Sequence, residues 1–166
     1  MKADARAALR FRGESPQGTL ADILRLAWQS DAFAALVLYR AKARLQARRI
    51  PVLPRLAHRL AMAIAQVSIG DPVSVQAGLY LPHGQVVLDG LVEVGAGVAI
   101  APFVTIGLRA GNLQGPTIED GVEIGTGAKL IGPIRVGAGA RVGANAVVVD
   151  DVPAGATVAG VPARAR

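Results

Sequence analysis

The last hundred residues of this chain repeat every six residues, and no other feature limits its possible folds so strongly. The repeat consists of aliphatic side chains in two runs whose phases differ by one residue. The runs comprise Ile69, Val75, Leu81 and Val87, followed by Val94, Ile100, Ile106, Ile118, Ile124, Leu130, Val136, Val142 and Val148, with one beat skipped at Asn112. A period of six matches neither an α-helix nor a simple alternating strand. It indicates a solenoid.

Three short extended segments joined by tight turns form a triangular coil of about 18 residues, and each coil stacks on the next through parallel strand pairing. The repeated aliphatic side chains then point into the prism, while Gly and Asn occupy the turns. Aromatic residues make up only 4% of the chain, which favours a narrow core of small aliphatic side chains. We therefore predict a mainly β fold with about five coils between residues 69 and 154.

The first 66 residues have a different composition, with 12 Lys and Arg against four Asp and Glu and only two of the 20 glycines. Apolar residues at helical spacing follow Thr19, Ser30 or Asp31, and Pro54, and they predict a short α-helical region before the solenoid. The predicted organisation is a mobile N-terminus (1–18), a basic α-helical region (19–66), a β-helix domain (67–158) and a C-terminal tail (159–166).

Composition also restricts the chemistry and the partners. The chain has no cysteine, so disulfides, thiolate metal sites and cysteine nucleophiles are excluded. Its first residues lead into no apolar signal segment, and we expect a cytoplasmic protein. The basic region has few aromatic residues and no nucleic-acid reading motif, so we expect no nucleic-acid partner. Contact between the basic helices and an anionic membrane surface stays open.

Several segments of the repeat resemble the hexapeptide-repeat acyltransferases, and within them the serine acetyltransferase-like branch. They are Leu81-Pro82-His83-Gly84, Val104-Thr105-Ile106-Gly107, Ile124-Gly125-Thr126-Gly127-Ala128-Lys129, Val142-Gly143-Ala144-Asn145-Ala146-Val147-Val148 and Ala159-Gly160-Val161-Pro162-Ala163-Arg164. The resemblance implies a left-handed parallel β-helix, a homotrimer, and acetyl-CoA bound between neighbouring prisms as donor for an O-acetyltransferase. The handedness comes from the resemblance alone, because parallel crossovers are normally right-handed.

The chain contains two histidines, and they differ in their surroundings. His58 lies in an apolar and basic helical stretch, which is typical of a helix-surface or packed histidine. His83 follows the inward Leu81 by two positions, at an outward turn. The resemblance implies that His83 is the general base, which accepts the proton of the acceptor hydroxyl. A carbonic anhydrase of the γ type shares this prism but needs three zinc-binding histidines, so no metal site is expected.

Two departures from the serine acetyltransferase pattern concern the acceptor. Pro82 replaces the aspartate that precedes the catalytic histidine, and Gln114-Gly115-Pro116 lacks an Arg-His pair before the proline. The acceptor is therefore open between serine and a sugar or glycan hydroxyl, and a non-catalytic trimeric scaffold is a further alternative. We predict that Asp89, Arg109 and Gln114 bind the acceptor, with the loop 107–116 covering the groove. The alternative for this loop is one degenerate side of a coil.

Coenzyme binding is predicted along one face of the prism. Thr126 and Ala144 are 18 residues apart, which is one coil, so their backbone groups stack and can bind an extended pantetheine arm. Arg164 is the predicted phosphate ligand, with Arg141 and Arg166 as alternatives. By resemblance, the coenzyme-binding residues are Gly107, Thr126, Ala144, Gly160, Val161 and Arg164.

Overall fold

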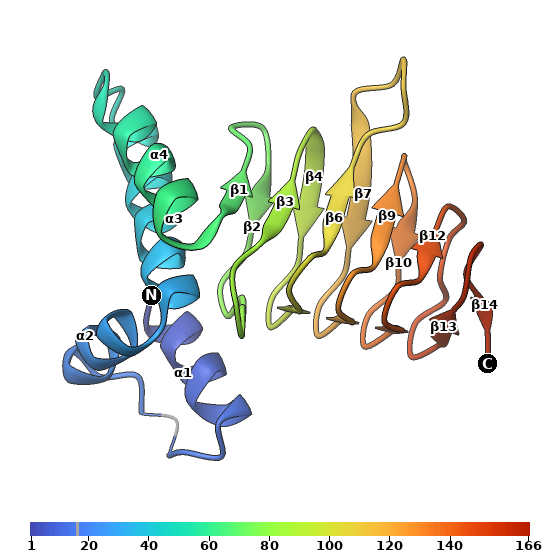
Figure 1. The fold of residues 1–166 in the computed structure, drawn as a ribbon, viewed down its shortest axis with the longest axis horizontal. Coiled ribbons are helices and arrows are strands. Elements are labelled where there is room, and N and C mark those ends of the chain that lie inside the picture. Colours follow the sequence, from blue (N-terminus) through green and yellow to red (C-terminus); the bar gives the residue numbers. More distant parts are fainter. Residues whose placement is uncertain (16) are drawn as a thin grey trace.

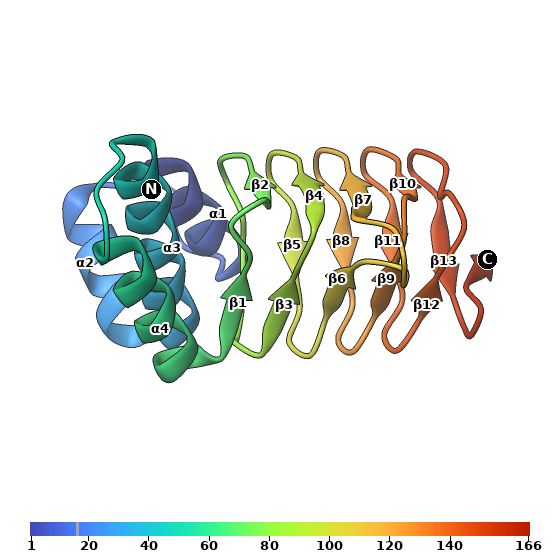
Figure 2. The ribbon, with the colours of Figure 1, turned by 90° about the horizontal axis from the view of Figure 1, so that it is seen from above.

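The computed structural model describes residues 1–15 and 17–166 and consists of a helical cluster followed by a three-sided solenoid (Figure 1). Seen from above, the coils stand in a row along the long axis with the helices at one end (Figure 2). The helices are α1 (Lys2–Phe11), α2 (Leu20–Gln29), α3 (Asp31–Ala47) and α4 (Leu53–Ala65). The strands are β1 (Val67–Ile69), β2 (Ser74–Val75), β3 (Val86–Leu88), β4 (Leu91–Val94), β5 (Ala99–Ile100), β6 (Thr105–Gly107), β7 (Gln114–Ile118), β8 (Glu123–Ile124), β9 (Lys129–Ile131), β10 (Arg135–Val136), β11 (Arg141–Val142), β12 (Val147–Val148), β13 (Thr157–Ala159) and β14 (Arg164–Ala165).

From β1 to β13, strands that follow one another in the chain lie on different faces of the prism, as a three-sided coil requires, whereas β14 returns to the sheet of β13. The three sheets have the orders β1-β3-β6-β9-β12, β10-β7-β4-β2 and β14-β13-β11-β8-β5. Their pairing is parallel except between β13 and β14. The aliphatic side chains that point inward from these sheets form one continuous core.

Most of the repeated aliphatic residues are buried as predicted, but Val75 is only half-buried and Val87 is exposed. Its side chain is 41% exposed, whereas Leu88 is 1% exposed and occupies the inward position. Leu81 and the next inward residue, Leu88, are seven positions apart instead of six. The inward position of every later repeat is therefore shifted by one residue. The offset between the two runs in the sequence is a local insertion at the corner between Leu81 and β3.

Two terminal predictions also need correction. The prediction of a mobile segment over 1–18 is wrong for Lys2–Phe11, which form α1, because Ala5 and Leu9 are buried in a cluster with Phe33. Pro16 lies outside the described residues. The predicted C-terminal tail over 159–166 turns back on the prism, since β14 pairs with β13.

Side-chain caps define where the middle helices begin. The Thr19 hydroxyl accepts a hydrogen bond from the Asp22 N–H at 3.1 Å, and the Asp22 carboxylate accepts one from the Thr19 N–H at 2.8 Å. The Ser30 hydroxyl accepts from the Phe33 N–H at 3.3 Å and starts α3. The bonds between Thr19 and Asp22 form a reciprocal capping box, and both hydroxyls satisfy a free N–H group of a first helical turn. Within the described residues, no helix combines the length and the hydrophobicity needed to cross a membrane.

Helix α3 completes the backbone hydrogen bonding of the first coil. This coil has no coil before it, so carbonyl oxygens on its outer side need other donors. Lys42 Nζ donates to the Ile69 carbonyl at 2.8 Å, and the Tyr39 hydroxyl donates to the Val73 carbonyl at 3.3 Å. The helix thus takes the place of a neighbouring strand with its side chains.

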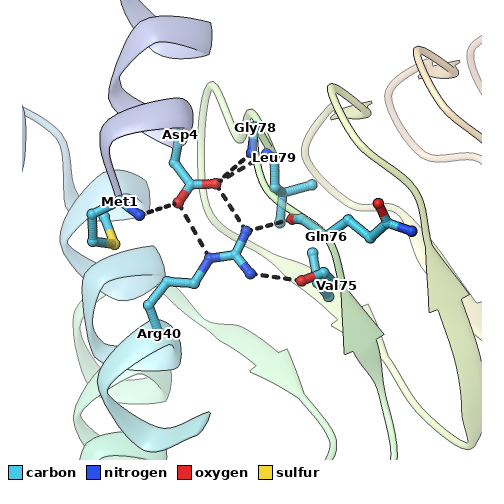
Figure 3. Close-up of polar contacts among 7 residues, drawn as sticks. All are labelled: Met1, Asp4, Arg40, Val75, Gln76, Gly78 and Leu79. Carbon is cyan, nitrogen blue, oxygen red and sulfur yellow. Dashed lines mark hydrogen bonds and ion pairs between the residues drawn. The ribbon is translucent and has the colours of Figure 1, made fainter. Parts of the chain in front are cut away.

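A buried ion pair joins α1, α3 and the first coil (Figure 3). The Asp4 carboxylate is fully buried and accepts from Arg40 Nη2 at 2.8 Å and Nε at 3.2 Å. It also accepts from the N–H groups of Gly78 and Leu79, at 2.9 and 3.1 Å. Arg40 in turn donates to the Val75 carbonyl at 2.7 Å. The Asp4 carboxylate and the Arg40 guanidinium are therefore both hydrogen-bonded, as charged groups must be when they are taken out of water.

The pair makes stability depend on the charge of Asp4. Burial by itself would raise the pKa of this carboxyl, but the hydrogen bonds and charge of Arg40, together with the Met1 ammonium, hold the pKa below its ordinary 3.8. A carboxyl whose pKa is lowered by folding stabilises the native state above its unfolded pKa. That stabilisation is lost as the pH falls through the folded pKa.

We predict that Asp4→Asn lowers the free energy of unfolding by about 3 kcal/mol at pH 7, because Arg40 then lacks its buried counter-ion. Urea unfolding of wild type and variant at pH 7 and pH 3 measures this. The difference between the two proteins should shrink at the lower pH, because pH 3 lies below the ordinary 3.8 of this carboxyl in the unfolded chain and part of the stabilisation is already lost there. Glu123→Gln is the matched control, since its partner Arg141 lies 3.6 Å away and both side chains are exposed. Equal losses in the two variants would contradict the role of Asp4.

Candidate active site

His83 lies at the corner that carries the extra residue, between Leu81 and β3. Its side chain is exposed. Two residues later, Gln85 has a left-handed backbone with φ of 62° and donates its N–H to the Ala65 carbonyl at 2.8 Å. The corner is therefore held against the last residue of α4, and the imidazole stands where the helical part meets the prism.

The imidazole lines a cavity of about 410 Å³ that lies between the helices and this corner. Its walls come from the end of α1, the junction of α2 and α3, the end of α4 and the corner itself. They consist of Arg12, Gln29, Ser30, Asp31, Ala32, Ile64, Ala65, Gln66, Pro82, His83, Gly84 and Gln85. One cation, one carboxylate and the imidazole thus line the same small polar cavity, and a few convergent polar groups with a titratable side chain are typical of a binding site.

Two residues of this cavity, Arg12 and Asp31, could not be assigned to it from the sequence. Asp31 stands in the sequence only as an alternative to Ser30 for the start of a helix, and nothing in the repeat connects it to His83. Arg12 lies in the segment that we predicted to be mobile. Only the packing of α1 and α3 against the first coil brings these side chains to the cavity.

The three predicted acceptor residues do not line the His83 cavity. His83 precedes β3, whereas Asp89 follows it, so the two lie at opposite edges of the same sheet. Arg109 follows β6, which pairs in parallel with β3 and therefore ends at the Asp89 edge. Gln114 begins β7 and lies opposite Leu91, two residues after Asp89. Within one chain, the residues predicted to bind the acceptor are therefore separated from His83 by the width of a sheet.

The loop between β6 and β7 is an insertion rather than a degenerate side of a coil. β6 continues the sheet of β3 and β7 continues the sheet of β4, so no side of the coil is replaced. Ile106 and Ile118 are 12 residues apart, whereas the corresponding Leu88 and Val94 are six apart. The extra residues form an excursion closed by a bridge between Arg109 and Asn112, and Figure 1 shows it projecting from the prism.

Two of the predicted coenzyme residues, Thr126 and Ala144, share the edge of His83. Successive corners on this edge are joined by hydrogen bonds from the Phe103 N–H to the Gln85 carbonyl and from the Asn145 N–H to the Thr126 carbonyl, both 2.8 Å long. An added Cβ at Gly125 would lie 2.7 Å from the Ala144 nitrogen, which shows how closely these corners stack. The edge therefore presents a continuous row of backbone groups that begins at the histidine.

The other predicted coenzyme residues extend this row or flank it. The Gly160 carbonyl accepts from the Val147 N–H at 3.0 Å, beyond the corner of Ala144, and the side chain of Val161 next to it is 73% exposed. Arg164 forms an exposed ion pair with Asp150 at 3.0 Å. Gly107 lies apart, at the end of β6 and opposite Ile131 of β9.

His58 faces a different cavity, of about 720 Å³, between the α3–α4 connection and the corner Gly70–Pro72. Partial burial lowers the pKa of its imidazole, and the charge of Lys42 lowers it further, while Asp71 acts in the opposite sense. Lys42 and Asp71 are themselves paired at 2.7 Å. His58 is thus a partly packed histidine of α4 and does not line the His83 cavity.

Comparison with known proteins identifies the family. Residues 115–150 match the model described as bacterial transferase hexapeptide (six repeats). A serine acetyltransferase of Helicobacter pylori (strain J99) is 38% identical over 134 residues, which cover 78% of each chain. The chain belongs to the serine acetyltransferase family. The serine acetyltransferase of Synechococcus elongatus is also 38% identical, over 80% of this chain but only 55% of its own length.

Solved structures of the family have the same architecture. The Neisseria gonorrhoeae serine acetyltransferase in complex with serine superposes with a TM-score of 0.83 at 31% identity, over 98% of this chain and 66% of that one. The Brucella abortus enzyme in complex with coenzyme A gives a TM-score of 0.86 at 27% identity, over 99% and 65%. The family match supports the left-handed β-helix that the resemblance implied. This chain spans between about half and four fifths of the length of these relatives.

We predict that Gly84→Ala destabilises the protein by about 1–3 kcal/mol, because an added Cβ would overlap the Ala65 carbonyl oxygen. The displaced corner should also reduce activity through His83. Gly107→Ala is the control for stability, since its Cβ would have its nearest neighbour at 3.8 Å. Urea unfolding compares the two variants. If Gly84→Ala is as stable as Gly107→Ala, then close packing against α4 does not hold the His83 corner in position.

Proposed function

We propose that this protein is an acetyl-CoA-dependent O-acetyltransferase that acetylates the hydroxyl of serine, with His83 as general base. The observation that carries the proposal is the position of His83, which lies in a polar cavity at the head of a continuous row of stacked backbone corners. Two relatives support it: the Neisseria gonorrhoeae enzyme, 31% identical, is in complex with serine, and the Brucella abortus enzyme, 27% identical, is in complex with coenzyme A.

The proposed reaction needs one proton to move twice. The His83 imidazole accepts the hydroxyl proton while the hydroxyl oxygen attacks the thioester carbonyl carbon, so that a C–O bond forms. The tetrahedral intermediate then collapses and its C–S bond breaks. The imidazolium returns the proton to the coenzyme A thiolate, which leaves O-acetylserine and coenzyme A. General base catalysis of this kind contributes about 10²–10⁴ in rate, and backbone N–H groups of the corners are the proposed oxyanion donors.

Asp31 is the proposed partner of the acceptor ammonium. It is the one carboxylate among the described residues of the His83 cavity, and it takes over from the aspartate that Pro82 replaces. The cap that Ser30 provides fixes the first turn of α3 and with it the backbone of Asp31. A neutral sugar hydroxyl would need no such charge, so this cavity favours serine over a glycan.

Coenzyme A is proposed to lie along the row of corners. Thr126 and Ala144 would bind the pantetheine arm through their backbone groups, with Gly160 and Val161 beside it. Gly107 ends β6 at the opposite edge of the sheet, so it would reach the arm only from a second copy of the chain. Arg164 would bind phosphate by exchanging its exposed partner Asp150, which costs little because surface ion pairs are weak.

The acceptor-binding role of Asp89, Arg109 and Gln114 needs a second copy of the chain. These residues lie at the edge of the sheet opposite His83, so we propose that the loop of one copy approaches the His83 cavity of the next in a homotrimer. Light scattering should then give the mass of three chains. A monomer with full activity would contradict the shared site.

We predict that His83→Gln lowers kcat by about 10²–10⁴ without changing the unfolding midpoint, because the imidazole is exposed and only its proton transfer is lost. His58→Gln, in the other cavity, should retain normal turnover. Coenzyme A release is measured with a thiol reagent on a panel of acceptors that includes serine and nucleotide-linked sugars. Normal turnover by His83→Gln on the best acceptor would exclude it as the base, and a preference for a sugar would exclude serine.

A further inference from the structure

The end of α1 brings a guanidinium to the predicted active site. We propose that Arg12 determines acceptor specificity by binding the carboxylate of the acceptor. This inference rests on the proposed function and names the chemical class that the cavity selects, an α-amino acid with a free carboxylate rather than any small alcohol.

Arg12 is the one Lys or Arg among the described residues that line the His83 cavity. No ion pair or hydrogen bond joins its guanidinium to another side chain in the described part of the chain, whereas Arg25, Arg40 and Arg135 all have such partners. Its side chain is therefore available to a ligand. A guanidinium binds a carboxylate through two parallel hydrogen bonds, which gives both strength and orientation.

The position of Arg12 relative to His83 is fixed by the residue before it. The ring of Phe11 stacks on Tyr80 with centroids 4.4 Å apart and planes within 8°. Tyr80 lies only three residues before His83 in the same segment. The buried Asp4 holds the other end of α1 on the first coil. Both ends of the helix are thus anchored to the coil that carries the imidazole.

The charges of the cavity complement an amino acid rather than the coenzyme. Arg12 and Asp31 supply one positive and one negative group beside the imidazole, which match a carboxylate, an ammonium and a hydroxyl. The cavity lies on the helical side of the His83 corner, since this corner contacts Ala65. Phe103 lies on its other side and leads toward the proposed coenzyme residues. The anion that meets Arg12 is therefore the acceptor's carboxylate and not a coenzyme phosphate.

The test compares L-serine with L-serinamide, which keeps the ammonium and hydroxyl but lacks the carboxylate charge. Wild type should prefer serine in kcat/KM. Arg12→Gln should lower kcat/KM for serine by about 10- to 100-fold, through KM, and leave serinamide and the KM of acetyl-CoA unchanged. Arg12→Lys should recover part of the loss. Arg10→Gln, an exposed arginine on the same helix that does not line the cavity, is the control.

Three results would overturn the inference: an equal loss on serine and serinamide, a raised KM for acetyl-CoA, or the same loss in Arg10→Gln. Calorimetric titration with serine and serinamide provides a readout that needs no turnover. If wild type transfers acetyl to neither compound, the proposed function fails. Arg12 is then still judged by whether wild type binds serine more tightly than serinamide and Arg12→Gln does not; equal binding of the two compounds by wild type overturns the inference.

Discussion

Backbone pairing between successive coils is the constraint on which the rest of this structure depends, because strands of two to five residues have few other contacts that fix their position. Each coil takes its hydrogen-bond partners from the coil before it. The first coil has none, so Lys42 and Tyr39 of α3 donate to its carbonyl groups, and Asp4 accepts from its N–H groups. The helical part is therefore a structural member of the prism, and the candidate site lies where the two meet.

The sequence predicted the prism because its determinants are local and repeated. Inward aliphatic side chains and flexible corners recur in each coil, so a single period revealed the core, and the resemblance supplied the handedness. The structure corrected this at Val87, where one extra residue moves the phase. The helix α1 escaped prediction because its burial depends on Phe33 and the first coil, segments that are distant in sequence and follow no common period.

For the same reason, only part of the candidate site could be predicted from the sequence. His83 stood out as an isolated histidine at an outward position of a known period. Arg12 and Asp31 reach it through tertiary packing, and no spacing in the chain records that contact. The six-residue repeat nevertheless indicated where the structure departs from a regular prism. Its two interruptions are the extra residue at the His83 corner and the loop that carries Arg109.

The closure of the first coil by helices also bears on how the molecule avoids assembling with itself. An uncovered end of a parallel solenoid is a row of free N–H and C=O groups, the kind of template on which strands of other molecules add and fibres grow. Here the side chains of α1 and α3 occupy that row. If the helices detached from the first coil, the prism would remain folded over most of its length but would expose unpaired backbone groups at that end. The helices therefore protect the solubility of the protein as well as its shape.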